Sequence, residues 1–307
     1  MIERGRLGGA GAGLSTLARA AMLAVALAAA IPVGVVLPSA ALAQEAAAVD
    51  PAVAADVAAL VETMKIGDIV AILREEGIDY GRTLQADMFP DAGGQGWEAS
   101  VALIYDAARM QEALVATLTR ELAQTPEAIA EMQSFFGSEL GQKVLTLEVE
   151  ARRTLLDEAA QEAARIAWED LAAGGTSRVD LLERFVSAND LIESNVMGAL
   201  NANLAFYRGM QEGGAFGGEM TEEQMLTDVW GQEADVRQQT TEWLFSYLTL
   251  AYGPLTDEEL EAYLAFSESD AGQALNAALF VAFDDVFTPI SGALGVAVAR
   301  QMQGQDI

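Results

Sequence analysis

The fold is decided by two stretches of sequence, TPEAIAEMQSFFGSELGQK (residues 125–143) and TDEELEAYLAFSESDAGQA (residues 256–274). They lie 131 residues apart and are identical at six of 19 positions, where chance would give roughly one or two. This repetition indicates a duplication. A division after Gly175 gives two tandem units of equal length, residues 44–175 and 176–307.

Each copy reads as a short helix, a corner and the start of a second helix. The threonine is a typical N-cap of the first helix, with Glu259 completing a capping box in the second copy, and the serine is a typical N-cap of the second helix. The phenylalanine is expected to be buried at the corner. The glycine would let the second helix approach its neighbour closely, and the glutamine could bond to exposed backbone groups. These predicted structural residues are Thr125, Phe135, Ser138, Gly141 and Gln142 in the first copy, and Thr256, Phe266, Ser269, Gly272 and Gln273 in the second.

The rest of the chain also follows a helical period, and proline and glycine mark the breaks. Continuous helical patterns cover residues 51–88, 97–123, 138–173 and 177–211. No alternating run of Val, Ile and Thr indicates a sheet. The sequence therefore predicts an all-α protein.

The first copy resembles a known family. Phe135-Phe136, a serine two residues later and Gly-Gln-Lys at 141–143 resemble the signature of a bacterial periplasmic family of unknown function, catalogued as domain-of-unknown-function family 2059. The resemblance is closest over residues 125–145, and it implies a helical fold and a periplasmic location but no established activity. In the second copy Ser267 replaces the second aromatic residue and Ala274 the lysine. A family site at that lysine would therefore be kept only by Lys143.

The first 43 residues are typical of a signal peptide. Arginines precede an apolar run over residues 20–37, and the small residues ending at Ala43 predict cleavage before Gln44. An uncleaved membrane anchor is the alternative, although Pro32 and Gly34 interrupt the run. We therefore expect a periplasmic protein with no stable membrane insertion after cleavage.

Composition excludes several function classes. The chain has a net charge of −29, which disfavours nucleic acid and anionic lipid as partners and favours a cationic one. It has no histidine and no cysteine, so Ser-His or Cys-His catalysis, the usual zinc ligands and disulfides are absent. Removal of residues 1–43, with three arginines and one glutamate, would make the charge two units more negative.

The remaining residues offer few candidates for chemistry. A Ser138–Lys143 dyad is conceivable but has no support beyond the presence of both residues. Carboxylate groups such as Glu148 and Glu150 are interpreted as solvated helix faces. Asp284-Asp285 is unusual because it interrupts the apolar stretch 274–299, which is interpreted as a core helix bent at Pro289.

The four tryptophans lie in helical patterns and are all expected to be buried. They are Trp97, Trp168, Trp230 and Trp243.

The functional prediction is an exported, non-catalytic helical protein that binds or scaffolds a protein partner in the cell envelope, without a cofactor. The alternative is a small-ligand or carboxylate-based metal-dependent activity in a cleft between the two halves. The partner, the oligomeric state and whether the halves share one core stay open from sequence.

Overall fold

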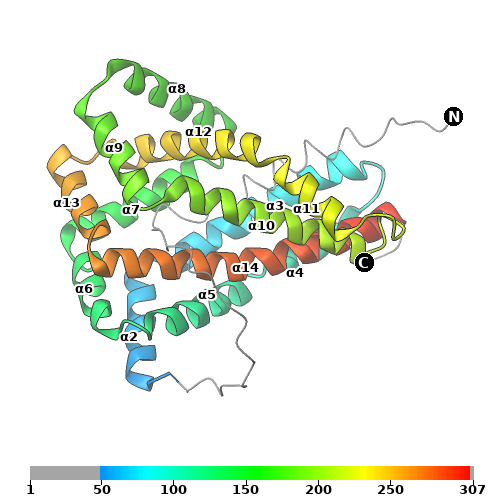
Figure 1. Ribbon diagram of the computed structural model, residues 1–307, viewed down its shortest axis with the longest axis horizontal. Helices are drawn as coiled ribbons and strands as arrows, with labels where there is room; N and C mark the ends of the chain where they lie inside the picture. The colour runs from blue at the N-terminus through cyan, green and yellow to red at the C-terminus, as the bar shows by residue number, and fades with distance from the viewer. Residues whose placement is uncertain (1–48, 305–307) are drawn as a thin grey trace.

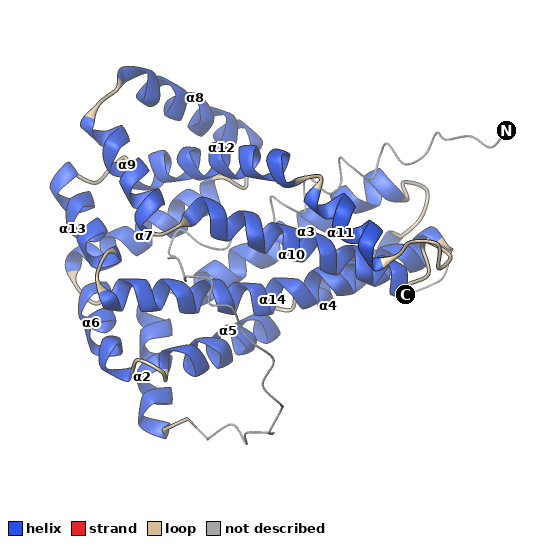
Figure 2. Ribbon diagram, in the orientation of Figure 1, coloured by secondary structure: helices blue, strands red, loops and turns tan. Residues whose placement is uncertain are grey.

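The computed structural model describes residues 49–304 of the 307-residue chain. Within this range the protein consists of helices joined by short loops, with no strand (Figures 1 and 2). The predicted all-α class is therefore confirmed. The predicted signal peptide, with Ala43 and Gln44 at its cleavage site, lies outside the described residues.

In chain order, the helices are α2 (Pro51–Thr63), α3 (Ile66–Met88), α4 (Gly94–Ile104), α5 (Ala107–Leu122), α6 (Pro126–Phe136), α7 (Glu139–Thr154), α8 (Glu158–Gly174), α9 (Ser177–Ala188), α10 (Leu191–Glu212), α11 (Glu222–Trp230), α12 (Glu233–Tyr252), α13 (Asp257–Ser267) and α14 (Asp270–Met302).

Each of the four continuous helical patterns is divided into two helices, so those predicted boundaries were wrong. Lys65 and Asp190 adopt a left-handed backbone, with φ of 56° and 47°, and turn the chain between α2 and α3 and between α9 and α10. Asp106 and Asp157 cap α5 and α8 by accepting the backbone N–H three residues ahead. The apolar period continues across these breaks, so it does not reveal them. Each break is made by a single residue at the start of the second helix.

Helix α14 runs through the centre of the molecule and packs closely against α10 (Figure 1). Glycines allow the two backbones to touch. A Cβ added at Gly209 of α10 would lie 2.9 Å from the carbonyl carbon of Gly292, and one at Gly295 of α14 would lie 2.8 Å from the amide nitrogen of Met210. Only residues without a Cβ permit this separation.

By length and composition, α14 is the one helix in the described part of the chain that could cross a membrane, and half of its most apolar window is buried inside the protein. Buried residues recur along its whole length, and α10, α5, α6 and α4 cover it. These contacts account for the apolar stretch 274–299, and the helix continues through Pro289.

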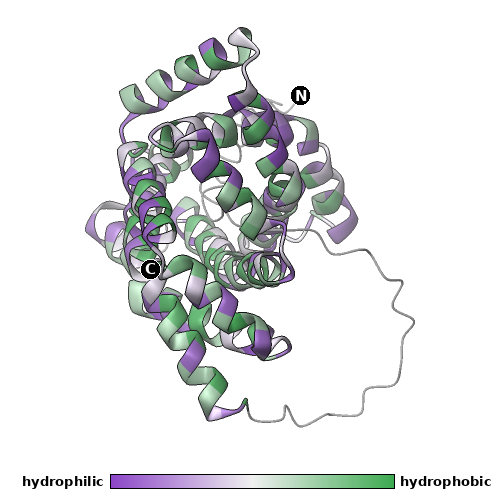
Figure 3. Ribbon diagram, turned by 90° about the vertical axis from the view of Figure 1, so that its left-hand side faces the viewer, coloured by the Kyte–Doolittle hydropathy of each residue, from purple (hydrophilic) through white to green (hydrophobic). Residues whose placement is uncertain are grey.

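One continuous hydrophobic cluster contains residues of both halves, so the halves share a core. A smaller cluster lies between α10, α11 and α12. Hydrophobic and hydrophilic residues alternate along most helices (Figure 3). The connecting helix α8 lies mainly on α12, where Trp168 stacks on Phe245 with ring centroids 4.4 Å apart.

Candidate functional site

The two copies of the repeated motif meet at one end of the molecule, where α6 and α7 lie beside α13 and α14 (Figure 1). The rings of Phe135 and Phe266 are stacked, with centroids 4.1 Å apart and planes 5° apart. Phe136 contacts Phe266 edge to face at 5.2 Å, and Tyr263 stacks on Phe135. Phe135 is half-buried and Phe266 is buried. The motif copies therefore form one joint junction between the halves.

In the first copy, Ser138, Gly141 and Gln142 close the corner between α6 and α7. The Ser138 hydroxyl accepts the Gly141 N–H at 3.1 Å. A Cβ at Gly141 would overlap the carbonyl oxygen of Phe135 and lie 2.6 Å from Cα of Phe136. The Gln142 side chain donates to the carbonyl oxygens of Phe136 at 2.8 Å and of the last residue of α2 at 3.0 Å.

The second copy repeats these contacts at the corner between α13 and α14. The Ser269 hydroxyl accepts the Gly272 N–H at 3.1 Å. A Cβ at Gly272 would overlap the carbonyl oxygen of Phe266 and lie 2.9 Å from Cα of Ser267. Gln273 donates to the carbonyl oxygens of Ser267 at 2.6 Å and of the last residue of α9 at 3.1 Å. In both copies a glutamine thus joins the open carbonyls of two helix ends.

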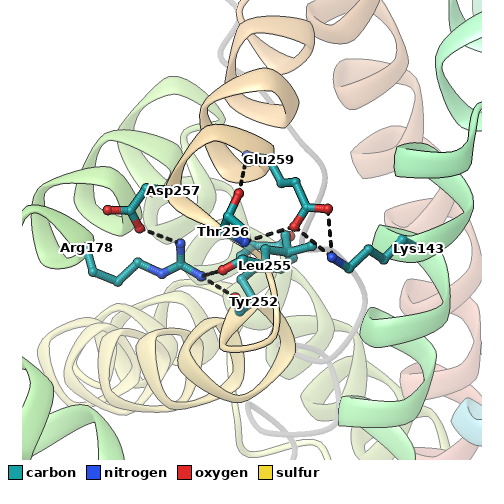
Figure 4. A network of polar contacts seen from close by, with 7 residues as sticks. All are labelled: Lys143, Arg178, Tyr252, Leu255, Thr256, Asp257 and Glu259. Atoms are coloured by element: carbon teal, nitrogen blue, oxygen red, sulfur yellow. Dashed lines mark hydrogen bonds and ion pairs between the residues drawn. The ribbon is translucent and has the colours of Figure 1, made fainter.

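The threonines of the two copies differ. Thr256 and Glu259 form a capping box, with hydrogen bonds of 3.2 and 2.9 Å (Figure 4). Thr125 lies at the N-cap of α6, but its side chain makes no capping bond, so the role inferred for it was wrong. Its ψ of 58° departs from the extended conformation of Thr256, and Pro126 follows it.

Lys143 belongs to this junction. Its ammonium group lies 2.7 Å from both carboxylate oxygens of Glu259, so the lysine of the first copy pairs with the capping box of the second (Figure 4). This ion pair and the bond to the Thr256 backbone lower the pKa of Glu259. On the other side of α13, Arg178 pairs with Asp257 at 2.9 Å and donates to two carbonyl oxygens before the helix. Together these cations fix the start of α13.

The Ser138–Lys143 dyad is not formed. The Ser138 hydroxyl donates to the carbonyl oxygen of Phe135 at 2.6 Å, and Lys143 is bound to Glu259. Each group is thus bonded to another partner in this structure.

We expect Lys143→Ala to lower the melting temperature by about 1–3 °C, because both partners are about one third exposed and such pairs contribute little. The difference should shrink at 1 M salt, because screening weakens the pair. Calorimetry at low and high salt checks this. A loss of the same size at low salt and at 1 M salt would contradict the electrostatic origin.

The most unusual titratable group is Glu148 on α7, which is buried beside the junction. The hydroxyls of Tyr252 and Tyr263 donate to its Oε1 at 2.7 and 3.1 Å. Burial raises the pKa of Glu148 to about 7, and the two hydroxyls partly oppose this rise. The interpretation of Glu148 as solvated was wrong, whereas Glu150 is exposed.

A signal for this burial is present in the sequence. Val144, Glu148 and Ala151 recur at helical spacing on the buried side of α7, together with Arg152. A carboxylate within such a stripe indicates a buried polar partner.

A buried ion pair lies next to Glu148. Arg152 donates to both oxygens of Glu76 on α3, at 3.1 and 2.8 Å, and both side chains are at least nine-tenths buried. Burial raises the pKa of Glu76 more than Arg152 lowers it. The Tyr247 hydroxyl donates to the Glu148 carbonyl at 3.3 Å. The network thus connects α3 and α7 of the first half with α12 and α13 of the second.

A cleft of about 470 Å³ opens between α3, α8 and α12, with Glu76 in its wall. Its other carboxylates are Asp79, Glu158, Glu162 and Glu242, and Arg165 and Trp243 also line it. Among the described residues, no group of three or more acidic side chains is arranged to hold a metal ion. Glu148 does not line the cleft.

The Asp284-Asp285 pair joins α14 to neighbouring helices. Asp285 accepts hydrogen bonds from Thr117 at 2.8 Å and Arg120 at 3.0 Å on α5, across the two halves. Asp284 accepts from Asn201 on α10 at 3.1 Å. These contacts explain the two acids within an apolar helix.

Trp230 does not follow the prediction made for the four tryptophans. Trp97 is buried, and Trp168 and Trp243 are half-buried, but Trp230 is 53 % exposed at the end of α11. Leu226, one turn earlier, is 37 % exposed. Helical period could not identify this outward face, because the neighbouring residues Met225 and Val229 supply the apolar positions that are buried.

The comparison with protein families agrees with the resemblance seen in the first half. No curated protein and no solved structure matches the chain. Residues 108–169, from α5 to α8, match the model of the family DUF2059, described as uncharacterized protein conserved in bacteria, and this match supports that family for the first half.

Proposed function

We propose that this chain is an exported, non-catalytic protein that binds a protein partner in the cell envelope through α11. The observation that carries the proposal is the exposed pair Leu226 and Trp230. Tryptophan is among the residues most enriched at the energetic centres of protein interfaces. Leu226 and Trp230 are four positions apart and therefore lie next to each other on the helix.

The inner side of α11 is packed against the rest of the protein. Met225 and Val229 are buried on the inner side of α11, and a capping box begins the helix at Thr221. Because the helix is anchored on that side, Leu226 and Trp230 face outward without rearrangement. A preorganised surface loses little conformational entropy on binding.

The proposal is tested by photocrosslinking in the native cell. A benzophenone amino acid replaces Leu226 in one variant, Trp230 in a second and Leu103, which is 63 % exposed on α4, in the control. A defined product from positions 226 and 230, and none from 103, supports the proposal. No product from α11, or the same products from all three positions, rejects it.

Export is the second part of the proposal, and it is supported by Ala43 and the apolar run before it. We expect mass spectrometry of the protein from a periplasmic fraction to find Gln44 at the N-terminus. A protein that starts at Met1 and stays with the inner membrane would instead indicate an uncleaved anchor.

We also propose that the two halves arose by duplication. Both halves turn at a left-handed residue, Lys65 or Asp190, and both close a corner with the same glutamine contacts. Left-handed backbone in a residue other than glycine is uncommon, and these are the two such positions in the part of the chain that the structure describes. Their equivalent places support a common origin.

A small-ligand role for the cleft between α3, α8 and α12 is the second candidate. It is favoured by the cleft volume and by carboxylates from both halves, Glu76 and Glu242 among them. A thermal-shift screen with calcium, magnesium and organic diamines tests it. Stabilisation of several degrees by one of these at micromolar concentration would support the ligand role. If none of them changes the melting temperature, the ligand role is rejected.

A further inference from the structure

The outer side of α11 carries a stripe of three residues. Glu223, Leu226 and Trp230 are spaced by three and four positions, so they lie on one side of the helix, and all three are exposed. The side chains of Leu226 and Trp230 begin about 6 Å apart. An apolar pair thus lies next to a carboxylate.

The chain segment that carries this stripe has charged residues of one sign. Residues 219–235 include six acidic residues and no basic one. Glu222 pairs with Arg208 and Glu233 pairs with Arg237. The other four are exposed and form no ion pair with any described residue: Glu219, Glu223, Asp228 and Asp235.

We propose that the α11 surface, defined as Glu223, Leu226 and Trp230, binds a cationic amphipathic segment of another protein. The proposal rests on the proposed function and specifies its partner. Apolar side chains of the segment contact Leu226 and Trp230, and a lysine or arginine of the segment faces Glu223. A cation can also stack on the indole ring of Trp230, which attracts positive charge to its face.

Charge complementarity selects this occupant over two others. A second copy of the chain would bring the unpaired Glu223 carboxylates of both copies together, and such like-charge contacts cost several kcal/mol in an interface. A bilayer surface with anionic headgroups would repel the same carboxylates. A cationic segment gains from both the apolar pair and the Glu223 carboxylate.

Binding of three labelled 18-residue peptides to the purified protein, measured by fluorescence anisotropy, tests the partner chemistry. In the first, leucine and lysine recur at helical spacing. In the second, glutamate replaces lysine, and in the third, serine replaces leucine. We expect the Lys/Leu peptide to bind at least about tenfold more tightly than either control, because it alone supplies both interactions.

Matched variants then locate the binding. Trp230→Ala should weaken Lys/Leu binding at least about tenfold, and Glu223→Gln should weaken it and reduce its salt dependence. Leu103→Ala, on an exposed leucine of α4, should leave it unchanged. All three changes are at exposed positions, and circular dichroism melting verifies that each variant is folded.

Several results would overturn the proposal. These are equal binding of the Glu/Leu peptide, equal binding by wild type and Trp230→Ala, dimerisation in sedimentation that Trp230→Ala abolishes, or binding to phosphatidylglycerol vesicles that needs Trp230. Failure of the peptide with successful crosslinking at position 226 would reject the cationic segment and keep the proposed function. Failure of crosslinking would reject the proposed function itself.

Discussion

Replacing Gly141 with alanine should lower the free energy of unfolding by about 3 kcal/mol, the range of severe packing clashes. The added Cβ would overlap the Phe135 carbonyl oxygen and approach Cα of Phe136 to 2.6 Å. Both are backbone atoms at the end of α6, so no side chain can rotate to make room. The whole corner would have to open, and the Gln142 bond to the Phe136 carbonyl would be stretched. Urea unfolding followed by circular dichroism measures the change.

Gly198→Ala is the matched control. Gly198 lies within α10, and a Cβ there would meet no atom within 4 Å. Alanine should therefore stabilise the helix by up to about 1 kcal/mol. If Gly141→Ala behaves like Gly198→Ala, the close approach at the corner does not limit stability.

The same change in the second copy tests the equivalence of the two corners. Gly272→Ala should destabilise the protein about as much as Gly141→Ala, because its Cβ would overlap the Phe266 carbonyl oxygen in the same way. The corners meet through the Phe135–Phe266 stack. The double variant should therefore lose less unfolding free energy than the sum of the losses of the two single variants. Tolerance of alanine at Gly272 would argue against a shared structural role.

The features that could be predicted from sequence are local. The all-α class follows from helical period, and Ser138, Ser269 and the Thr256–Glu259 box occur where the sequence places caps. A cap involves residues three positions apart, so its signal is complete within a few residues. Thr125 has the same local signal without the bond, because the backbone before Pro126 does not direct its hydroxyl to the helix.

The features that could not be predicted depend on distant parts of the chain. Lys143 and Glu259 are 116 residues apart, and Glu148 and Tyr263 are 115 apart. Which helix covers which face decides that Trp230 is exposed. The apolar stripe of α7 indicates that Glu148 is buried, but it does not show which tyrosines bind it.

The largest dependence on pH should come from Glu148. Its pKa is about 7 in the folded protein against 4.5 as the ordinary value. Between pH 4.5 and pH 7, Glu148 is therefore protonated in the folded state but already ionised in the unfolded state. Stability from this group is complete below pH 4.5 and falls as the pH rises to about 7, by a total of about 3 kcal/mol.

Other groups beside Glu148 must be separated from this effect. The groups that face it are Tyr247 and Tyr252 on α12, Tyr263 on α13 and the Glu76–Arg152 pair. Burial raises the pKa of all three tyrosines well above 10, so they stay protonated throughout this range. The pKa of Glu76 is also raised, so it contributes a slope of the same sign in wild type and in any Glu148 variant.

Glu148→Gln isolates the contribution, because the amide oxygen can still accept both tyrosine hydroxyls but does not titrate. Relative to the variant, wild type should lose about 3 kcal/mol of unfolding free energy between pH 4.5 and pH 8, measured by urea unfolding. Glu150→Gln, exposed two residues further along α7, should follow the wild-type curve. Parallel curves for wild type and Glu148→Gln would contradict the raised pKa. They would mean that Glu148 is already ionised at pH 7, because the tyrosine hydroxyls lower its pKa as much as burial raises it. A loss in wild type that the variant does not share would instead make this carboxyl a source of acid-favoured stability at the junction of the two halves.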